Sequence, residues 1–160
     1  SSEHFDSDRF RFPTGLLDQG RKSMEQALSC SDIVYVVRSY GRASSFRRMT
    51  CGVLEQLLPL NSCRLVLAAE DPDLDIYRSN AGPWENRFIL GVKGAERQIA
   101  FIDQISPRGT KVMIFDDNIL KFMDCGKTIG TKFSEEDLEA SNCLEHGEHG
   151  SEHGPQQLEQ

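Results

Sequence analysis

The stretch IVYVVRSYGR, residues 33–42, decides how the rest of the chain is read. Its first five residues are all β-branched or aromatic, and polar residues stand on both sides of them. This pattern is typical of a strand that is buried on both faces of a sheet. The next five residues are polar or turn-forming, and Gly41 among them can adopt backbone conformations that strain other residues. The stretch therefore predicts a buried strand whose carboxyl end opens into a polar loop.

Helical and extended patterns alternate downstream of this strand. Residues 46–57 place apolar side chains at spacings of three and four, and Pro59 ends the helix that this spacing predicts. The remaining expected elements are strands over residues 63–70, 87–92 and 111–115 and a helix over residues 93–105. This order predicts an α/β fold in which helices are layered around a mostly parallel sheet.

Three polar clusters stand where expected strands end: residues 38–42, 70–73 and 116–118. The carboxyl ends of parallel strands meet at one edge of the sheet, where ligands bind. The third cluster follows the apolar run VMIF, which can be buried, and it sets Asp116 and Asp117 side by side. Adjacent carboxylates repel each other, so positive charge close by would lower the cost of keeping them together.

A divalent metal is one source of that positive charge. In an extended segment Asp116 and Asn118 point to the same side, and carboxylate or amide oxygens are ligands for the hard cations Mg²⁺ and Mn²⁺. Such an ion could in turn hold a diphosphate. Arg38 and Arg42, at another expected strand end, could also meet an anionic ligand. The alternative is a solvated strand end at which Asp117 and Asn118 begin a turn.

The acidic character of the chain is confined to its end. The net charge is -7, but residues 134–160 contain eight acidic residues and neither Lys nor Arg, so the remainder carries a net charge of +1. This near-neutral body gives no footprint for unspecific nucleic-acid binding. We expect a poorly ordered N-terminal extension over residues 1–30, in which residues 16–28 could form a helix. One domain over residues 31–133 and an acidic, low-complexity, disordered tail over residues 134–160 would follow.

The cysteines and the hydropathy of the chain indicate in which compartment the protein is expected. The five cysteines form no CxxC pair and their number is odd, which favours a reducing compartment over a disulfide framework. We therefore expect an intracellular protein, cytoplasmic or nuclear. No run of about 18 apolar residues occurs, so no membrane span is expected. The chain begins with Ser1 rather than Met, and we expect a piece of a longer polypeptide.

The order of these motifs resembles that of a family of sugar-transferring enzymes. The segments VVRSYGR (36–42), GVKGAERQIAFI (91–102) and KVMIFDDNI (111–119) are together similar to the nucleotide-diphospho-sugar transferases of the GT-A kind. More narrowly, they resemble the TET/JBP-associated glycosyltransferase family, over residues 33–120. The resemblance implies a GT-A, Rossmann-like three-layer fold, a UDP-sugar donor and Mn²⁺ or Mg²⁺. It also implies sugar transfer to an acceptor, which in this family could be a hydroxylated base in DNA.

The resemblance assigns roles to eight residues. Five would contact the nucleotide-sugar: Ser39, Arg42, Asp71, Asp73 and Arg97. Asp71 or Asp73 would accept a hydrogen bond from the base or ribose, and the alternative is that it only caps a solvated turn. Arg97 would face the diphosphate. Three would hold the metal and the ribose: Asp116, Asp117 and Asn118. The family usually has a third Asp at the last of these positions and a Pro where this chain has Arg38.

Two other readings of the sequence stay open. Only about forty residues follow Asn118, fewer than the acceptor-binding half of such an enzyme needs, so the domain could be truncated. A degenerate module of the same fold, which binds a partner or acts as a scaffold without catalysis, is therefore the main alternative. A response-regulator-like phosphoacceptor domain is disfavoured, because no late strand carrying a lysine follows Asn118.

Overall fold

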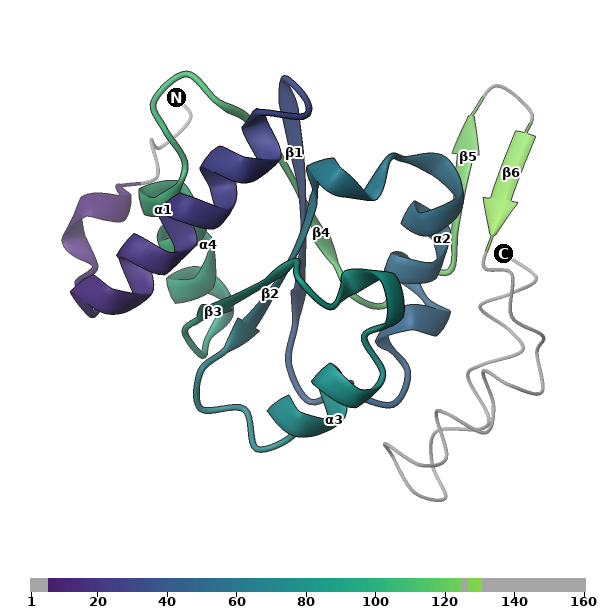
Figure 1. Ribbon diagram of the computed structural model, residues 1–160, viewed down its shortest axis with the longest axis horizontal. Helices are drawn as coiled ribbons and strands as arrows, with labels where there is room; N and C mark the ends of the chain where they lie inside the picture. Colours follow the sequence, from purple (N-terminus) through teal and green to yellow (C-terminus); the bar gives the residue numbers. More distant parts are fainter. Residues whose placement is uncertain (1–5, 125–126, 131–160) are drawn as a thin grey trace.

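A parallel β-sheet forms the centre of the domain. The computed structural model describes residues 6–124 and 127–130 of the chain. Its main sheet has four strands in the order β3-β2-β1-β4, and all neighbouring strands run parallel (Figure 1). The strands are β1 (Ile33–Ser39), β2 (Cys63–Ala68), β3 (Phe88–Gly91) and β4 (Lys111–Asp116). The predicted α/β fold with a mostly parallel sheet is confirmed.

Helices cover both faces of this sheet and complete a three-layer arrangement (Figure 1). One face carries α1 (Thr14–Leu28) and α4 (Ala95–Ile105), and the other carries α2 (Thr50–Leu57) and α3 (Leu74–Ser79). Short 3-10 helices occupy several connections: Ser7–Arg9, Phe46–Arg48, Leu60–Ser62 and Gly82–Trp84. Alternate residues of β1 feed the two cores: Val34 and Val36 pack against α1 and α4, whereas Val37 packs against α2. The unbroken apolar runs of the central strands follow from this burial on both faces.

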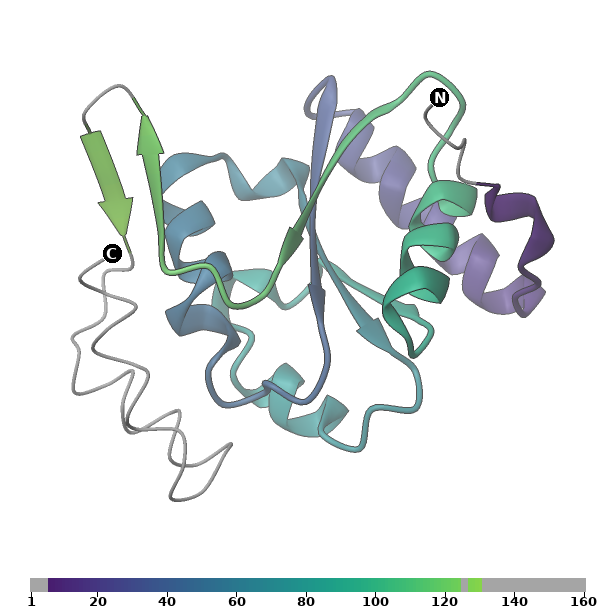
Figure 2. The same cartoon turned by 180° about the vertical axis from the view of Figure 1, so that it is seen from behind.

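β4 departs from the expected burial of the run VMIF. Met113 is 48% exposed and Ile114 is 38% exposed, whereas every residue of β2 is buried. Within the described residues, β4 pairs only with β1 and is an edge strand, as the view from behind shows (Figure 2). An edge strand has neighbours on one side only, so its outer side chains stay in contact with solvent.

The N-terminal region corrects the expected domain boundary at residue 31. α1 is a regular helix whose Met24 and Ala27 are fully buried in the core with Phe101 and Ile105 of α4. The helix that was considered over residues 16–28 is therefore confirmed and belongs to the domain, whereas the expectation of low order does not hold for residues 14–28. Residues 1–5 lie outside the described part of the chain, as does the expected disordered tail over residues 134–160.

Two further differences concern helices and the end of the described chain. The helix expected over residues 46–57 is split, because the backbone of Met49 leaves the helical region between the 3-10 turn and α2. α3 and a two-stranded hairpin, β5 (Lys121–Asp124) and β6 (Lys127–Gly130), were not expected. Phe122 of this hairpin packs edge-on against Phe115 of β4. In the described part of the chain, no helix is long and apolar enough to span a membrane.

Two glycines of α1 offer a test of its packing against α4. A Cβ at Gly20 would lie 2.7 Å from Cγ2 of the buried Ile105, whereas a Cβ at Gly15 would meet nothing within 4 Å. For Gly20→Ala, an overpacking cost of about 1–3 kcal/mol should exceed the gain in helix propensity, leaving a net loss in the free energy of unfolding of about 1 kcal/mol.

Gly15→Ala is the matched control for this prediction. It relieves glycine's conformational entropy cost without a clash, so it should raise the free energy of unfolding by about 0.5 kcal/mol. Urea titrations of both variants measure the two changes. A gain in stability for both substitutions would show that α1 does not pack tightly on α4.

Candidate functional site at the carboxyl edge of the sheet

The strand order reverses between β1 and β4. From β1 the chain moves outward through β2 and β3 on one side, and then returns through α4 to place β4 on the other side. In open parallel sheets, ligands bind at the carboxyl ends of the two strands where the order reverses. β1 ends at Ser39 and β4 at Asp116, so the first and third polar clusters of the sequence meet at this point.

A buried hydrogen-bond network connects Asp117 to the end of β1. The Asp117 carboxylate accepts a hydrogen bond from the Ser39 hydroxyl at 2.6 Å, and Nε of Arg42 lies 3.3 Å from its other oxygen. The side chains of Asp117 and Arg42 are 12% and 26% exposed. A hydrogen-bonded cation next to a buried carboxylate offsets much of the cost of its desolvation. Ser39, Arg42 and Asp117, three of the predicted site residues, are therefore brought together.

Tyr77 of α3 completes this network from the opposite side. Its phenol oxygen lies 2.6 Å from the Ser39 hydroxyl and accepts a hydrogen bond from the backbone N–H of Arg42 at 2.8 Å. Because Ser39 uses its only proton to bond Asp117, Tyr77 donates to Ser39. Burial raises the pKa of Tyr77 well above its usual value, which keeps the phenol protonated for this role.

Asp116 is neutralised separately from Asp117. Nη2 of Arg38 lies 2.6 Å from Asp116, whose side chain is 65% exposed, and Nη1 of Arg38 donates to the carbonyl of Ala95 at 3.2 Å. The two adjacent carboxylates thus point to different partners, and each partner is an arginine of the β1 strand end. These arginines supply the positive charge that the sequence required.

This donor set does not fit a divalent metal. Asp117 is held by Ser39 and Arg42, Asp116 by Arg38, and the side chain of Asn118 is exposed. Within residues 6–124 and 127–130, no group of three or more His, Cys, Asp or Glu side chains could hold an ion. An ion would have to compete with a guanidinium for either carboxylate.

Asp71 organises the loop after β1. Its carboxylate accepts the backbone N–H groups of Gly41 and Asp73, both at 2.9 Å, and the residue is 3% exposed. Gly41 has a φ of 66°, a left-handed conformation that favours glycine. Asp71 thus fixes the turn that presents Arg42, and its oxygens are engaged by the backbone. Asp73 is half-buried at the start of α3, and in the described residues its carboxylate has no partner.

A cavity of about 250 Å³ opens beside this network at the ends of β1 and β3. Ser39, Tyr40, Lys93, Gln98 and Asp117 are among the residues that line it. The Lys93 ammonium lies 5.0 Å from the centre of the exposed Tyr40 ring, which links the loops that follow the two strands. The amino end of α4 also borders the cavity and has no side-chain cap. Such a helix end favours anions.

Arg97 does not join this site. Its guanidinium stacks over Phe12, 5.4 Å from the ring centre, on the side of α4 that faces the N-terminal segment. Sequence reasoning assigned no role to Tyr77, Gln98 or Tyr40. Tyr40 was recognisable from its place directly after a buried strand, whereas the first two lie on helices and reach the site only through tertiary packing.

Comparison with known proteins adds no identity to this geometry. No protein-family model matches the chain, and neither the search of characterised proteins nor that of solved structures gives a significant match.

Proposed function

We propose that this is a glycosyltransferase-like domain that binds a nucleotide-diphospho-sugar and transfers the sugar to an acceptor, which could be a hydroxylated DNA base. The observation that carries the proposal is the buried network of Ser39, Arg42 and Asp117 beside a cavity at the point where the strand order reverses. Its supports are the resemblance of residues 33–120 to GT-A enzymes and the position of that cavity.

The charges around the cavity suit a diphosphate. Lys93 and the uncapped amino end of α4 offer positive charge, and the buried Nε of Arg38 has no hydrogen-bond partner among the described residues. An acceptor oxygen of a ligand would satisfy that donor. The cavity is smaller than the roughly 300–1,000 Å³ that is usual for ligand sites. It would therefore hold one part of the donor, while the remainder would lie across the open edge of the sheet.

A binding module without catalysis is the second candidate. The two carboxylates closest to the reversal point, Asp116 and Asp117, are both paired with arginines. Both carboxylates thus hold the strand ends and the β1 loop together, a structural role that requires no catalysis. The geometry thus accounts for donor binding more fully than for transfer.

Thermal shift measurements with nucleotide-sugars test the binding step. At a concentration of 100 times Kd, UDP-sugar should stabilise the protein by about 2.7 kcal/mol, which raises Tm by several degrees. Lys93→Ala should weaken binding about tenfold, or about 1.4 kcal/mol. Lys22→Ala, which removes an exposed lysine from α1, is the matched control. No shift with any nucleoside diphosphate or its sugar would refute the proposal.

Two added arms separate the remaining predictions. The Mn²⁺ or Mg²⁺ that the resemblance implies is tested by repeating the titration with each ion and with a chelator. The arginine-paired carboxylates predict an unchanged Kd, and tighter binding with either ion would show that they hold a metal. Mass spectrometry that detects release of free sugar, or its transfer to hydroxymethylated DNA, distinguishes an enzyme from a non-catalytic binding module. Binding without turnover on any offered acceptor would favour the module.

A further inference from the structure

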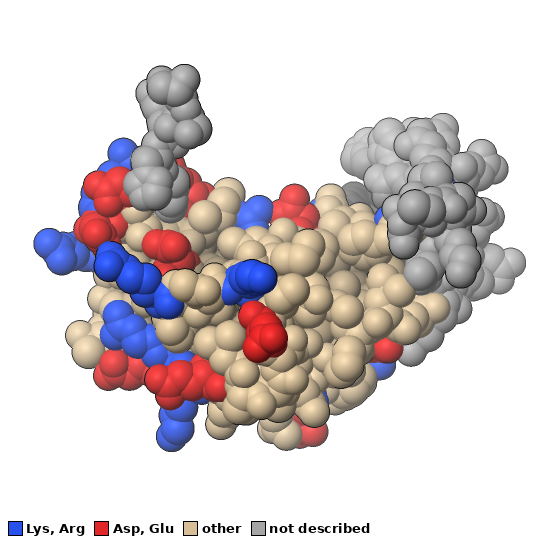
Figure 3. Space-filling view, turned by 90° about the horizontal axis from the view of Figure 1, so that it is seen from above, with Lys and Arg blue, Asp and Glu red and all other residues tan. Residues whose placement is uncertain are grey.

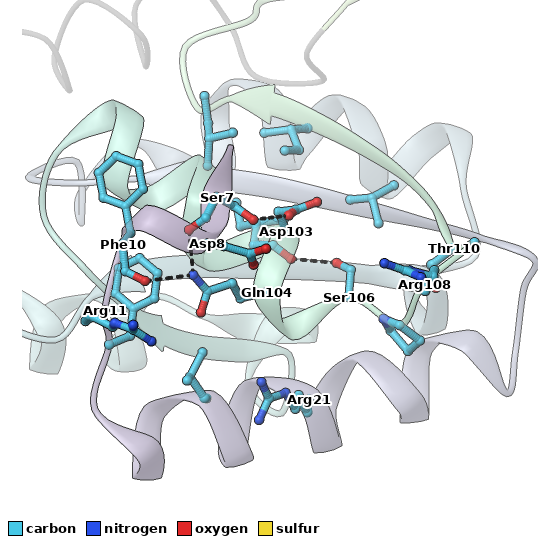
Figure 4. A pocket seen from close by; sticks show the side chains of 18 residues that line it. Ser7, Asp8, Phe10, Arg11, Arg21, Asp103, Gln104, Ser106, Arg108 and Thr110 are labelled. Atoms are coloured by element: carbon cyan, nitrogen blue, oxygen red, sulfur yellow. Dashed lines mark hydrogen bonds between the residues drawn. The ribbon is translucent and has the colours of Figure 1, made fainter. Parts of the chain in front are cut away.

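A second and larger groove lies on the α1 and α4 side of the sheet. It encloses about 890 Å³ between the N-terminal segment, the two helices, the loop before β4 and β4 itself (Figure 4). It shares no lining residue with the cavity at the carboxyl edge. The groove therefore requires an explanation of its own.

The groove has an apolar floor along the free edge of the sheet. Besides Pro107, seven apolar side chains line it: Phe10, Phe12, Leu17, Ile99, Ile102, Val112 and Ile114. The last of these is 38% exposed and belongs to β4, whose outer side has no neighbouring strand in the described residues. Exposed apolar surface with polar surroundings marks a site of interaction.

Arginines from three different elements surround this floor. Arg11 comes from the N-terminal segment, Arg21 from α1 and Arg108 from the loop before β4 (Figure 4). Arg11 and Arg108 have no carboxylate within ion-pair distance among the described residues, and Arg21 has only Asp18 at 3.8 Å. Seen from above, basic and acidic side chains gather together over this end of the molecule, and the surface beyond it is largely uncharged (Figure 3).

Two carboxylates also lie within the groove. Asp103 accepts a hydrogen bond from the Ser7 hydroxyl, and Asp8 lies beside it (Figure 4). An anionic occupant would therefore place its charges at the arginines of the rim and its apolar groups over the floor. The chemistry of the groove fits an acidic segment that also contains leucines.

This chain contains such a segment. Residues 134–160 have eight acidic residues, no Lys or Arg, and three leucines: Leu138, Leu144 and Leu158. The described chain ends at Gly130, and 30 residues follow it. Fully extended, they span about 100 Å, whereas a folded domain of this size has a radius of gyration of about 14 Å. The segment is therefore long enough to reach any face of the domain.

We propose that the acidic segment 134–160 docks into the groove between α1, α4 and β4. Its leucines cover Ile99, Val112 and Ile114, and its carboxylates pair with the rim arginines. The charges on both sides face water, so salt screens the attraction within a Debye length of about 8 Å at physiological ionic strength. The docking is consequently weak and salt-sensitive. It is also independent of nucleotide-sugar binding, because the groove and the cavity share no lining residue.

A spin label in the segment of the full-length chain tests the contact. The label is attached to Cys143, which lies within the segment. The substitutions Cys30→Ser and Cys125→Ser remove two other thiols, and Cys51 and Cys63 are buried and do not react. Amides of residues 102, 112 and 114 should lose most of their NMR intensity to the label. Amides around Tyr40 should keep theirs.

Charge reversal of the rim gives the decisive comparison. Arg11→Glu combined with Arg108→Glu should abolish the broadening. Salt at 0.5 M should do the same, because it shortens the Debye length to about 4 Å. Arg78→Glu, which reverses an exposed arginine on α3, is the control and should leave the broadening intact. Spectra with the label reduced establish that each variant is folded.

Three outcomes would overturn the proposal. Broadening of another surface, such as the carboxyl edge of the sheet, would place the segment elsewhere. Broadening that survives charge reversal of both rim arginines would remove the electrostatic basis. In a third experiment, an isotope-labelled copy without the spin label is mixed with a spin-labelled copy that carries no isotope. Broadening that occurs only in this mixture would assign the groove to the segment of a second molecule instead of the same chain.

Discussion

Replacing Asp117 by Ala is expected to lower the free energy of unfolding by about 2–3 kcal/mol and to abolish nucleotide-sugar binding. The carboxylate connects Ser39 and Arg42, and its side chain is only 12% exposed. Removal of one partner from a buried ion pair costs about 3–5 kcal/mol because the other charge is left unpaired. The 26% exposure of Arg42 reduces that figure, since water can partly solvate the guanidinium.

Asp116→Ala is the matched control, since it removes the adjacent carboxylate from the same strand end. Asp116 is 65% exposed, so its ion pair with Arg38 should contribute no more than about 1 kcal/mol. Urea titration measures the stability of both variants, and titration calorimetry measures their affinity for UDP-sugar. Equal losses of stability for the two substitutions would contradict the central position of Asp117 in the network.

The second large effect concerns Trp84, the one tryptophan of the chain. Trp84→Ala should lower the free energy of unfolding by about 3–5 kcal/mol. The indole is fully buried against the core beneath α2 and α3, and its Nε1–H donates to Glu55 at 2.8 Å. The substitution removes both the packing and the hydrogen bond. It also leaves a cavity that the surrounding side chains can fill only in part.

Trp84→Phe separates these two contributions. It keeps an aromatic ring but loses the donor, and Glu55 retains Arg47 at 3.1 Å. We therefore expect a smaller loss, of about 1–3 kcal/mol. Chemical denaturation at low temperature allows both variants to be measured even if Trp84→Ala is partly unfolded at 37 °C. A small loss for Trp84→Ala would mean that the ring is not a core residue.

Much of the fold was predictable because the central strands carry their own signal. A parallel strand that is buried on both faces must be apolar along most of its length, as residues 33–37 and 65–68 are. β4 shares that apolar pattern and yet is half open to solvent, because burial depends on a neighbour beyond its own sequence. α3 has only six residues, too few for a helical period to be evident.

The candidate site was predictable to the extent that strand ends converge. Ser39 and Asp117 lie together because β1 and β4 are neighbours whose carboxyl ends share one edge. The direction of a side chain on a helix or in a loop does not follow from such a rule. Arg97 faces Phe12, and Asp71 serves the backbone of its own loop, because tertiary contacts decide these orientations.

The sequence by itself determined the alternation of strands and helices, the polar character of the strand ends and the concentration of acid beyond residue 134. These properties depend on residue type and local spacing, which folding does not alter. Only the tertiary structure decided how the adjacent aspartates are neutralised. Strand pairing sets Arg38 beside Asp116, and the turn held by Asp71 sets Arg42 beside Asp117. Electrostatic compensation depends on distances of a few ångströms between segments almost eighty residues apart, and the chain order alone does not specify those distances.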